Sequence, residues 1–171
     1  MKTAVFGATG YTGRVLMRLL LDHPFVDRVI PVSRSAAGET VHGRDPGLFN
    51  QYPNRFTKDG KFLSREDILG AEPDAIFSAL PPGDSANYCG PFFKKSVIID
   101  LSADFRLENP KTHESVYGQE APFPRLRSQA VYGLAEIYRE QLTKADIVAV
   151  PGCYPTCVLL PLIPLIRRNL I

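Results

Sequence analysis

Short apolar runs of four to six residues recur along this 171-residue chain, separated by polar stretches or by stretches rich in glycine and proline. Such runs are short for helices and contain few polar interruptions, which is typical of strands buried on both faces of a parallel sheet. The predicted strands are residues 3–6, 29–32, 75–80, 97–101 and 147–150.

Helical periodicity fills several of the stretches between these strands. Residues 11–21 place Val15, Leu16, Leu19 and Leu20 on one side of a predicted helix. Further helices are expected at 65–69, at 85–95 with a break near Gly90-Pro91, at 135–144 and at 158–166. Strands that alternate with helices predict one doubly wound, Rossmann-like α/β domain, with a mostly parallel sheet and helices on both faces.

Two long segments lack a clear period. Residues 35–60 and 102–127 are polar or rich in proline, and we expect both to be largely irregular. A short strand around Phe56 is the one regular element expected in the first of them.

The turn between the first strand and the first helix carries three glycines at intervals of three, in the run Gly7-Ala8-Thr9-Gly10-Tyr11-Thr12-Gly13. Gly7 permits a tight turn, Gly10 lets the backbone approach a phosphate, and Gly13 lets the helix pack closely on the strand. Unpaired N–H groups at the helix N-terminus favour an anion there. The run predicts that Gly7, Thr9, Gly10, Tyr11, Thr12 and Gly13 bind a dinucleotide, a ligand-free turn being the alternative.

The end of the second strand indicates which dinucleotide is bound. NAD sites carry an acidic residue there, whereas this chain has Ser33-Arg34-Ser35. A guanidinium between two hydroxyls suits a 2′-phosphate through charge-assisted hydrogen bonds. We therefore expect NADP(H), while a solvated surface role for Arg34 remains the alternative.

A cysteine follows the last predicted strand. Cys153 comes after Pro151-Gly152, and Pro155 suits the first turn of a helix. The partial positive charge at a helix N-terminus favours the thiolate over the thiol, so Cys153 is the candidate nucleophile. A structural cysteine is the alternative. Cys157, one turn further along, is expected to be an inert packing residue.

Composition excludes several classes of function. The net charge is +2 and the basic residues are scattered, which gives no support for a nucleic-acid partner. Three cysteines form no disulfide framework, and His23, His42 and His113 lie too far apart for metal-ligand spacing. No apolar stretch reaches the roughly 20 residues of a membrane span, so we expect a cytoplasmic protein with no membrane contact.

Four segments of the chain carry a resemblance to one enzyme family. They are the glycine run 7–13, Asp100-Leu101-Ser102-Ala103-Asp104-Phe105-Arg106, Tyr132-Gly133-Leu134-Ala135-Glu136, and Pro151-Gly152-Cys153-Tyr154-Pro155-Thr156. In these segments the chain resembles the N-acetyl-γ-glutamyl-phosphate reductases, the NADPH-dependent enzymes of arginine biosynthesis. Many members have proline at the position of Ala135.

The resemblance implies a reaction and a set of residues for it. Cys153 would attack an acyl phosphate to form a thioester, which hydride from NADPH would reduce to N-acetylglutamate 5-semialdehyde. Arg106 would hold the phosphate of the substrate with Ser102 nearby, and Leu80-Pro81 would form a loop beside the cofactor. For Arg106, a structural ion pair with Asp104 or Glu108 is the alternative.

Members of that family are much longer than this chain. Their second half carries a substrate and dimerisation domain with an acid/base histidine, so residues 1–171 are expected to be the NADP-binding part of a homo-oligomeric enzyme. The expected fragment ends with the helix of Cys153. Two other functions stay open: a stand-alone NADP-binding module without catalysis, and an aspartate-semialdehyde dehydrogenase, whose cysteine motif differs.

Overall fold

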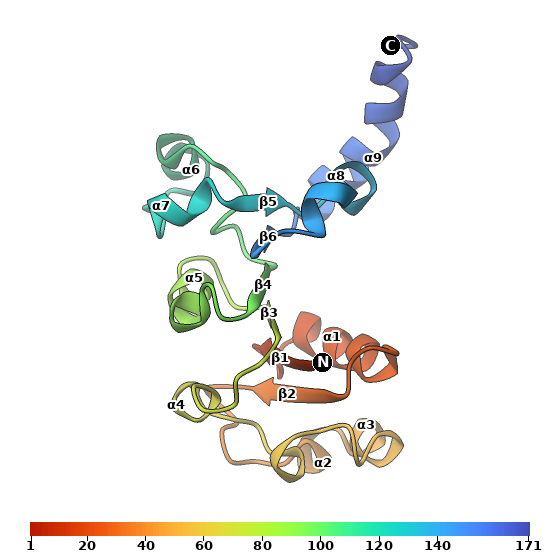
Figure 1. Cartoon of the computed structure of the whole chain (residues 1–171), viewed down its shortest axis with the longest axis vertical. Helices are drawn as coiled ribbons and strands as arrows, with labels where there is room; N and C mark the ends of the chain where they lie inside the picture. The colour runs from red at the N-terminus through yellow and green to blue at the C-terminus, as the bar shows by residue number, and fades with distance from the viewer.

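The computed structural model describes residues 1–171, apart from the side chain of Lys58. Its centre is a parallel sheet of six strands in the order β2-β1-β3-β4-β6-β5 (Figure 1). The strands are β1 (Lys2–Phe6), β2 (Arg28–Val32), β3 (Ala75–Ser78), β4 (Val97–Asp100), β5 (Ala130–Tyr132) and β6 (Ile147–Ala149). The predicted doubly wound fold is confirmed, and β5 is a strand that the sequence pattern did not predict.

Helices connect these strands. They are α1 (Tyr11–Asp22), α2 (Val41–Arg44), α3 (Pro46–Gln51), α4 (Arg65–Ile68), α5 (Asp84–Cys89), α6 (Pro110–Tyr117), α7 (Pro124–Arg127), α8 (Ala135–Leu142) and α9 (Cys153–Arg167), with 3₁₀ turns η1 (Lys58–Gly60) and η2 (Gly90–Phe92). The break expected near Gly90-Pro91 is confirmed, because α5 ends at Cys89 and a 3₁₀ turn follows.

The two segments expected to be irregular contain short helices. Thr40 caps α2 and Asp45 caps α3 through side-chain hydrogen bonds to backbone N–H groups. Asn109 caps α6 in the same way. These helices have four to eight residues, too few to establish a hydrophobic period, so only their caps marked them in the sequence. The strand expected around Phe56 is reduced to an isolated bridge with Val29.

The buried side of α1 agrees with the predicted one only in part, because Leu20 is buried and Leu16 is half-buried against the core. Gly13, Met17, Leu20 and Leu21 face the sheet. Of the residues expected there, Val15 is 56% exposed and Leu19 is 64% exposed. Apolar residues occupy positions 15–17 and 19–21, which is more than one side of the helix, so packing on the sheet rather than periodicity decides which of them are buried.

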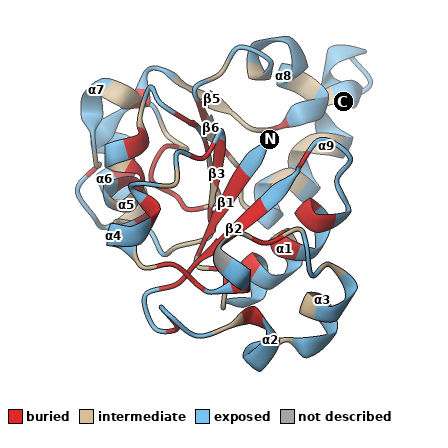
Figure 2. Ribbon diagram, turned by 60° about the horizontal axis from the view of Figure 1, so that its bottom comes forward, coloured by how far each residue is buried: buried red, intermediate tan, exposed pale blue. Residues whose placement is uncertain are grey.

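Helices lie on both faces of the sheet but cover them unequally. On one face lie α4, α5, α6 and α7, whereas α1 lies on the other beside β1 and β2, α8 contacts β5 at the far end of the sheet, and α9 extends away from the sheet beyond β6 (Figures 1 and 2). Within the described residues no helix packs over β3 and β4 on the side of α1. Phe77 and Ile99 are only half-buried, while their neighbours Ile76 and Ile98 are fully buried. On the side of α1, the sheet face at β3 and β4 is therefore partly exposed.

All six strands run in parallel, so the loops that follow them meet at one edge of the sheet. Chain order reverses between β1 and β3, and ligands of open α/β sheets bind in the crevice at such a switch point. The loops after β4 and β6 are also neighbours, because these strands pair directly. Within the described residues, no helix is both long and apolar enough to span a membrane.

Candidate active site

The glycine turn is closely packed. Gly7 has φ +75°, and a Cβ there would lie 2.7 Å from the carbonyl oxygen of Ala79. A Cβ on Gly13 would overlap the carbonyl oxygen of Gly7. Gly7 and Gly13 therefore allow the turn and α1 to pack together, whereas Gly10 is exposed at the start of the helix.

The N-terminus of α1 is open to an anion. Gly10 is the cap residue and no side chain of the described residues caps this helix of 12 residues. Tyr11 and Thr12 form its exposed first turn. The first N–H groups of a helix have no internal partner, so here they remain free for the oxygens of a phosphate.

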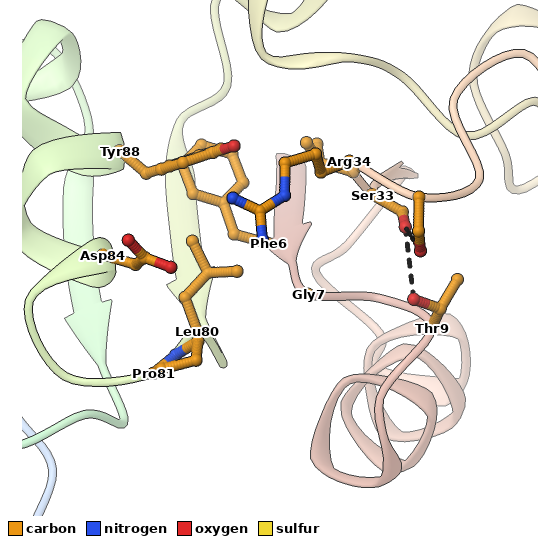
Figure 3. Close-up of a pocket in the computed structure, with 11 residues that line it drawn as sticks. Phe6, Gly7, Thr9, Ser33, Arg34, Leu80, Pro81, Asp84 and Tyr88 are labelled. Carbon is orange, nitrogen blue, oxygen red and sulfur yellow. Dashed lines mark hydrogen bonds between the residues drawn. The ribbon is translucent and has the colours of Figure 1, made fainter.

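A pocket of about 190 Å³ lies beside this turn, between the ends of β1, β2 and β3 (Figure 3). It is lined by Phe6, Gly7, Thr9, Val32, Ser33, Arg34, Ser35, Leu80, Pro81, Asp84 and Tyr88. The structure therefore brings together three segments that the sequence singled out separately: the glycine turn, Ser33-Arg34-Ser35, and Leu80-Pro81.

Three hydroxyl groups cluster on one side of the pocket. The Oγ1 of Thr9 is 3.2 Å from the Oγ of Ser33, which is 3.4 Å from the Oγ of Ser35. The guanidinium of Arg34 points away from them, toward the side of Tyr88 and Leu80 (Figure 3). Arg34 is exposed and makes no hydrogen bond or ion pair with any residue that the structure describes, so its charge is free to meet a ligand.

Four lining residues were not predicted from the sequence. Phe6 and Val32 are the last residues of their strands, a position that does mark the edge where ligands bind. Asp84 and Tyr88 lie on α5, and only the packing of that helix against the sheet brings them to the pocket.

The second part of the site surrounds the cysteine. Cys153 is exposed at the first position of α9, with Gly152 as the cap residue. The Nε of Arg106 donates to the carbonyl of Val150 at 2.8 Å, and its Nη2 donates to the carbonyl of Leu101 at 2.8 Å. A Cβ on Gly152 would lie 3.3 Å from Nη1 of Arg106. The guanidinium therefore faces the residue that precedes Cys153.

Two observations define what Arg106 is free to do. It forms no ion pair with Asp104 or Glu108 in the described part of the chain, so that alternative is wrong. Its Nη1 has no hydrogen-bond acceptor among the described residues. An uncompensated cation with a free donor, next to an exposed thiol, suits an anionic substrate.

Ser102 is buried in the turn that follows β4. Its Oγ donates to Asp100 at 2.9 Å and accepts from the backbone N–H of Asp104 at 3.1 Å. These bonds engage the hydroxyl within the protein and fix the turn that carries Arg106. Direct contact of Ser102 with a substrate stays a prediction.

A buried polar cluster supports this turn. Asp100 accepts from the hydroxyls of Ser85 at 2.5 Å and Ser102 at 2.9 Å, and Ser85 also contacts Ser78 at 2.6 Å. Burial raises the pKa of the Asp100 carboxyl, although these hydrogen bonds oppose the rise. Burial, aided by the nearby charge of Asp100, raises the pKa of Cys89 to about 12, so Cys89 remains a thiol at neutral pH.

The remaining cysteine departs from its expected role. Cys157 is exposed on α9, so the prediction that it packs in apolar surroundings is wrong for the described chain. No group of three metal-ligating side chains occurs within the described residues.

Comparisons with known proteins identify the relatives of this chain. N-acetyl-γ-glutamyl-phosphate reductase of Akkermansia muciniphila is 43% identical over 175 residues, which cover 100% of this chain and 49% of the relative. The reductase of the same name from Neisseria meningitidis is 44% identical over 170 residues, covering 98% of this chain and 47% of the relative. The resemblance found in the motifs is confirmed, and the chain spans about half the length of these curated relatives.

A solved structure and a family model complete the comparison. The crystal structure of aspartate semialdehyde dehydrogenase with NADP from Candida albicans superposes with a TM-score of 0.59 at 16% identity, over 97% of this chain and 46% of that one. At this identity the likeness shows the fold alone. The family model described as semialdehyde dehydrogenase, NAD binding domain, matches residues 2–145. The chain therefore belongs to the semialdehyde dehydrogenase family, as its NAD-binding domain.

Proposed function

We propose that this chain supplies the cofactor site and the nucleophile of an NADPH-dependent reductase that converts N-acetyl-γ-glutamyl phosphate to N-acetylglutamate 5-semialdehyde. The observation that carries this proposal is the guanidinium of Arg106 beside Gly152, one residue before the exposed Cys153. The names of the curated relatives support the choice of substrate.

The pocket and the glycine turn fit NADPH. Gly10, Tyr11 and Thr12, at the open N-terminus of α1, would receive the pyrophosphate, since Gly7 and Gly13 let this helix end approach the turn. Thr9, Ser33 and Ser35 would offer hydroxyls to the 2′-phosphate, and the free cation of Arg34 would balance its charge. Leu80 and Pro81 would form the apolar wall of the cofactor site. NADPH supplies the hydride.

The residues around Cys153 account for the acyl chemistry. The thiolate forms a bond to the acyl carbon of the substrate, and the bond from that carbon to the phosphate oxygen breaks, which leaves a thioester. Arg106 would hold the departing phosphate through Nη1, while its other nitrogens keep the guanidinium fixed on Val150 and Leu101. Hydride, which bound NADPH would supply, would add to the thioester carbon, and loss of the Cys153 thiolate from that carbon would give the semialdehyde.

The proton transfers require an acid/base group, and each of the three histidines of the described chain has a partner elsewhere. His23 bonds to the backbone of Phe25, His42 packs on the ring of Phe49, and His113 bonds to Arg127. We therefore propose that residues 1–171 work with a second domain, which carries the acid/base histidine and the dimer interface of a cytoplasmic homo-oligomer. The proposal involves neither nucleic acid nor membrane.

The test uses the full-length protein that contains this chain, assayed in the reverse direction. Semialdehyde, NADP⁺ and phosphate should yield NADPH and the acyl phosphate, with no activity when phosphate is omitted. Cys153→Ser should lower the rate roughly a thousandfold or more, because the covalent route is lost. Cys157→Ser is the matched control and should leave the rate unchanged. Undiminished activity of Cys153→Ser would contradict the mechanism.

The same assay separates the other two functions. Oxidation of aspartate semialdehyde in preference to the N-acetylglutamate compound would identify an aspartate-semialdehyde dehydrogenase. Binding of NADPH with no oxidation of either aldehyde would identify a binding module without catalysis.

A further inference from the structure

A buried cation on α7 plays no part in the mechanism above. Arg127 is 1% exposed, yet no described carboxylate accepts a hydrogen bond from it. Its Nε and Nη2 donate to the carbonyl of Leu107 at 3.0 and 2.7 Å, and its Nη1 donates to the carbonyls of Asp104 and Pro122. Burial lowers the pKa of Arg127 and the nearby charge of Asp104 opposes this effect, so the buried guanidinium is stabilised by that charge and by the carbonyls to which it donates.

The partner of Arg127 on α6 is a neutral histidine. Nη2 of Arg127 lies 2.8 Å from Nδ1 of His113, which is also 1% exposed. A guanidinium only donates hydrogen bonds, so Nδ1 must accept and the ring proton is on Nε2. Burial and the charge of Arg127 both lower the pKa of His113, which favours this neutral form. His113 therefore fixes the orientation of Arg127.

The carbonyls that Arg127 binds flank Arg106. Asp104 lies two residues before Arg106 and Leu107 lies one residue after it, so one guanidinium clamps both ends of the turn that carries the other. The same turn also reaches the cofactor side, because the carboxylate of Asp104 accepts from the N–H groups of Gly83 at 2.7 Å and Ala86 at 2.9 Å. The clamped turn thus joins the two parts of the site.

We propose that Arg127, oriented by His113, is a positioning residue that clamps the turn 104–107 and so holds Nη1 of Arg106 beside Gly152, the residue before Cys153. The inference rests on the proposed function, which assigns Arg106 to the substrate phosphate. Arg127 itself touches neither substrate nor cofactor. Removal of the Arg127 side chain should displace the guanidinium of Arg106 from Cys153 and leave the exposure of the Cys153 thiol unchanged.

The test measures charge selectivity at Cys153 in the 171-residue chain. The thiol is alkylated with iodoacetate, which is anionic, and with iodoacetamide, which is neutral and of similar size, and both rates are read at the Cys153 peptide by mass spectrometry. The rate with iodoacetate divided by the rate with iodoacetamide reports the positive charge beside the thiol. A general loosening of the chain would raise both rates and so would leave this ratio unchanged. The variant Arg106→Gln, which lacks this charge, gives the ratio expected when no guanidinium lies beside the thiol. We expect roughly a three- to tenfold fall, as for one nearby charge in a partly solvated site.

Arg127→Met should lower the ratio toward that of Arg106→Gln, while Arg127→Lys, which keeps the charge on a single donating nitrogen, should restore part of it. Arg125→Met is the matched control, since Arg125 is exposed on the same helix, and should leave the wild-type ratio. If Arg127→Met does not fold, Arg127→Lys carries the test, with an intermediate ratio expected. A wild-type ratio in a folded Arg127 variant would overturn the inference. A wild-type ratio in Arg106→Gln would instead overturn the proposed role of Arg106.

Discussion

At the scale of single residues, each part of the site contains one arginine: Arg106 lies beside Cys153, and Arg34 lines the pocket. The guanidinium of Arg106 is fixed by two backbone carbonyls, whereas that of Arg34 has no protein partner within the described residues. Fixing a guanidinium before the ligand arrives reduces the entropy lost on binding. Arg34, which is exposed at the pocket, instead has to be ordered by the ligand.

Arg34→Asp should weaken binding of NADPH by roughly tenfold or more, because it replaces a charge-assisted hydrogen bond to phosphate with a repulsive charge. NADH, which lacks the 2′-phosphate, should lose much less affinity. The measurement is calorimetric titration of the folded chain with each cofactor. Arg28→Asp, at the opposite end of β2, is the matched control. Equal losses of affinity for NADPH and NADH would show that Arg34 does not bind the 2′-phosphate.

Gly13 is the residue where the backbone leaves least space. Gly13→Ala should destabilise the chain by about 1–3 kcal/mol, since its Cβ would overlap the carbonyl oxygen of Gly7. NADPH affinity should fall as well, because α1 must move away from the turn. Gly70→Ala is the control, since a Cβ there meets no atom within 4 Å. Urea unfolding of both variants provides the comparison, and equal stability of the two would contradict the close packing.

At the scale of elements, the sequence predicted the strands well and the short helices poorly. The strand at 29–32 and the stretch 97–99 of the next one are continuous apolar runs, and such runs are typical of strands buried in a parallel sheet. The helices α6 and α7 are short and polar, and the buried pair His113–Arg127 that joins them is invisible until the chain is folded.

The candidate site shows the same division. Three parts of the site come directly after predicted strands: the glycine turn, Ser33-Arg34-Ser35 and Cys153. Because the strands of a parallel sheet all end at the same edge, the sequence predicted that these parts lie at that edge. Asp84 and Tyr88 were missed because their place in the pocket depends on how α5 packs on the sheet. The buried side of α1 was predicted only in part for a related reason, since Val15 and Leu19 are exposed while Met17 and Leu21 are buried beside Leu20.

The buried pair of His113 on α6 and Arg127 on α7 predicts that the stability of the chain depends on pH. The pKa of His113 is lower in the folded chain than its usual value of 6.5, so the unfolded chain takes up the proton first as the pH falls. This contribution to stability is complete above the unfolded pKa and declines as the pH falls below it toward the folded pKa. His113→Asn keeps an acceptor for Arg127 but cannot titrate.

Urea unfolding at about pH 7.5 and about pH 5.5 brackets the ordinary histidine pKa and so checks this prediction. The wild-type chain should lose more unfolding free energy between these values than His113→Asn. His42→Asn, a change at an exposed histidine, is the control and should lose as much unfolding free energy between the two pH values as the wild type. The same loss in His113→Asn as in the wild type would show that other groups cause it.

At the scale of the whole molecule, the chain exposes apolar surface that the fold does not cover. On α9, Val158 is 52% exposed and Ile166 is 55% exposed, and no residue of this helix is buried (Figure 2). Together with the half-buried Phe77 and Ile99 on the open sheet face, this surface favours association.

The 171-residue chain alone should therefore self-associate and bind a hydrophobic dye. Val158→Lys combined with Ile166→Lys should reduce both effects, while Lys substitutions at the exposed polar positions Glu136 and Gln141 of α8 should not. Sedimentation velocity and dye fluorescence measure the two effects. A wild-type chain that stays monomeric at high concentration and binds no dye would contradict this expectation.

The central claim is that the pocket between β1, β2 and β3 binds NADPH through its 2′-phosphate. The most direct test is calorimetric titration of the wild-type chain with NADPH and with NADH under one set of conditions. We expect one NADPH per chain, bound at least roughly tenfold more tightly than NADH, the factor that a charged hydrogen bond contributes. Equal affinity for the two cofactors, tighter binding of NADH, or binding of neither would contradict the claim.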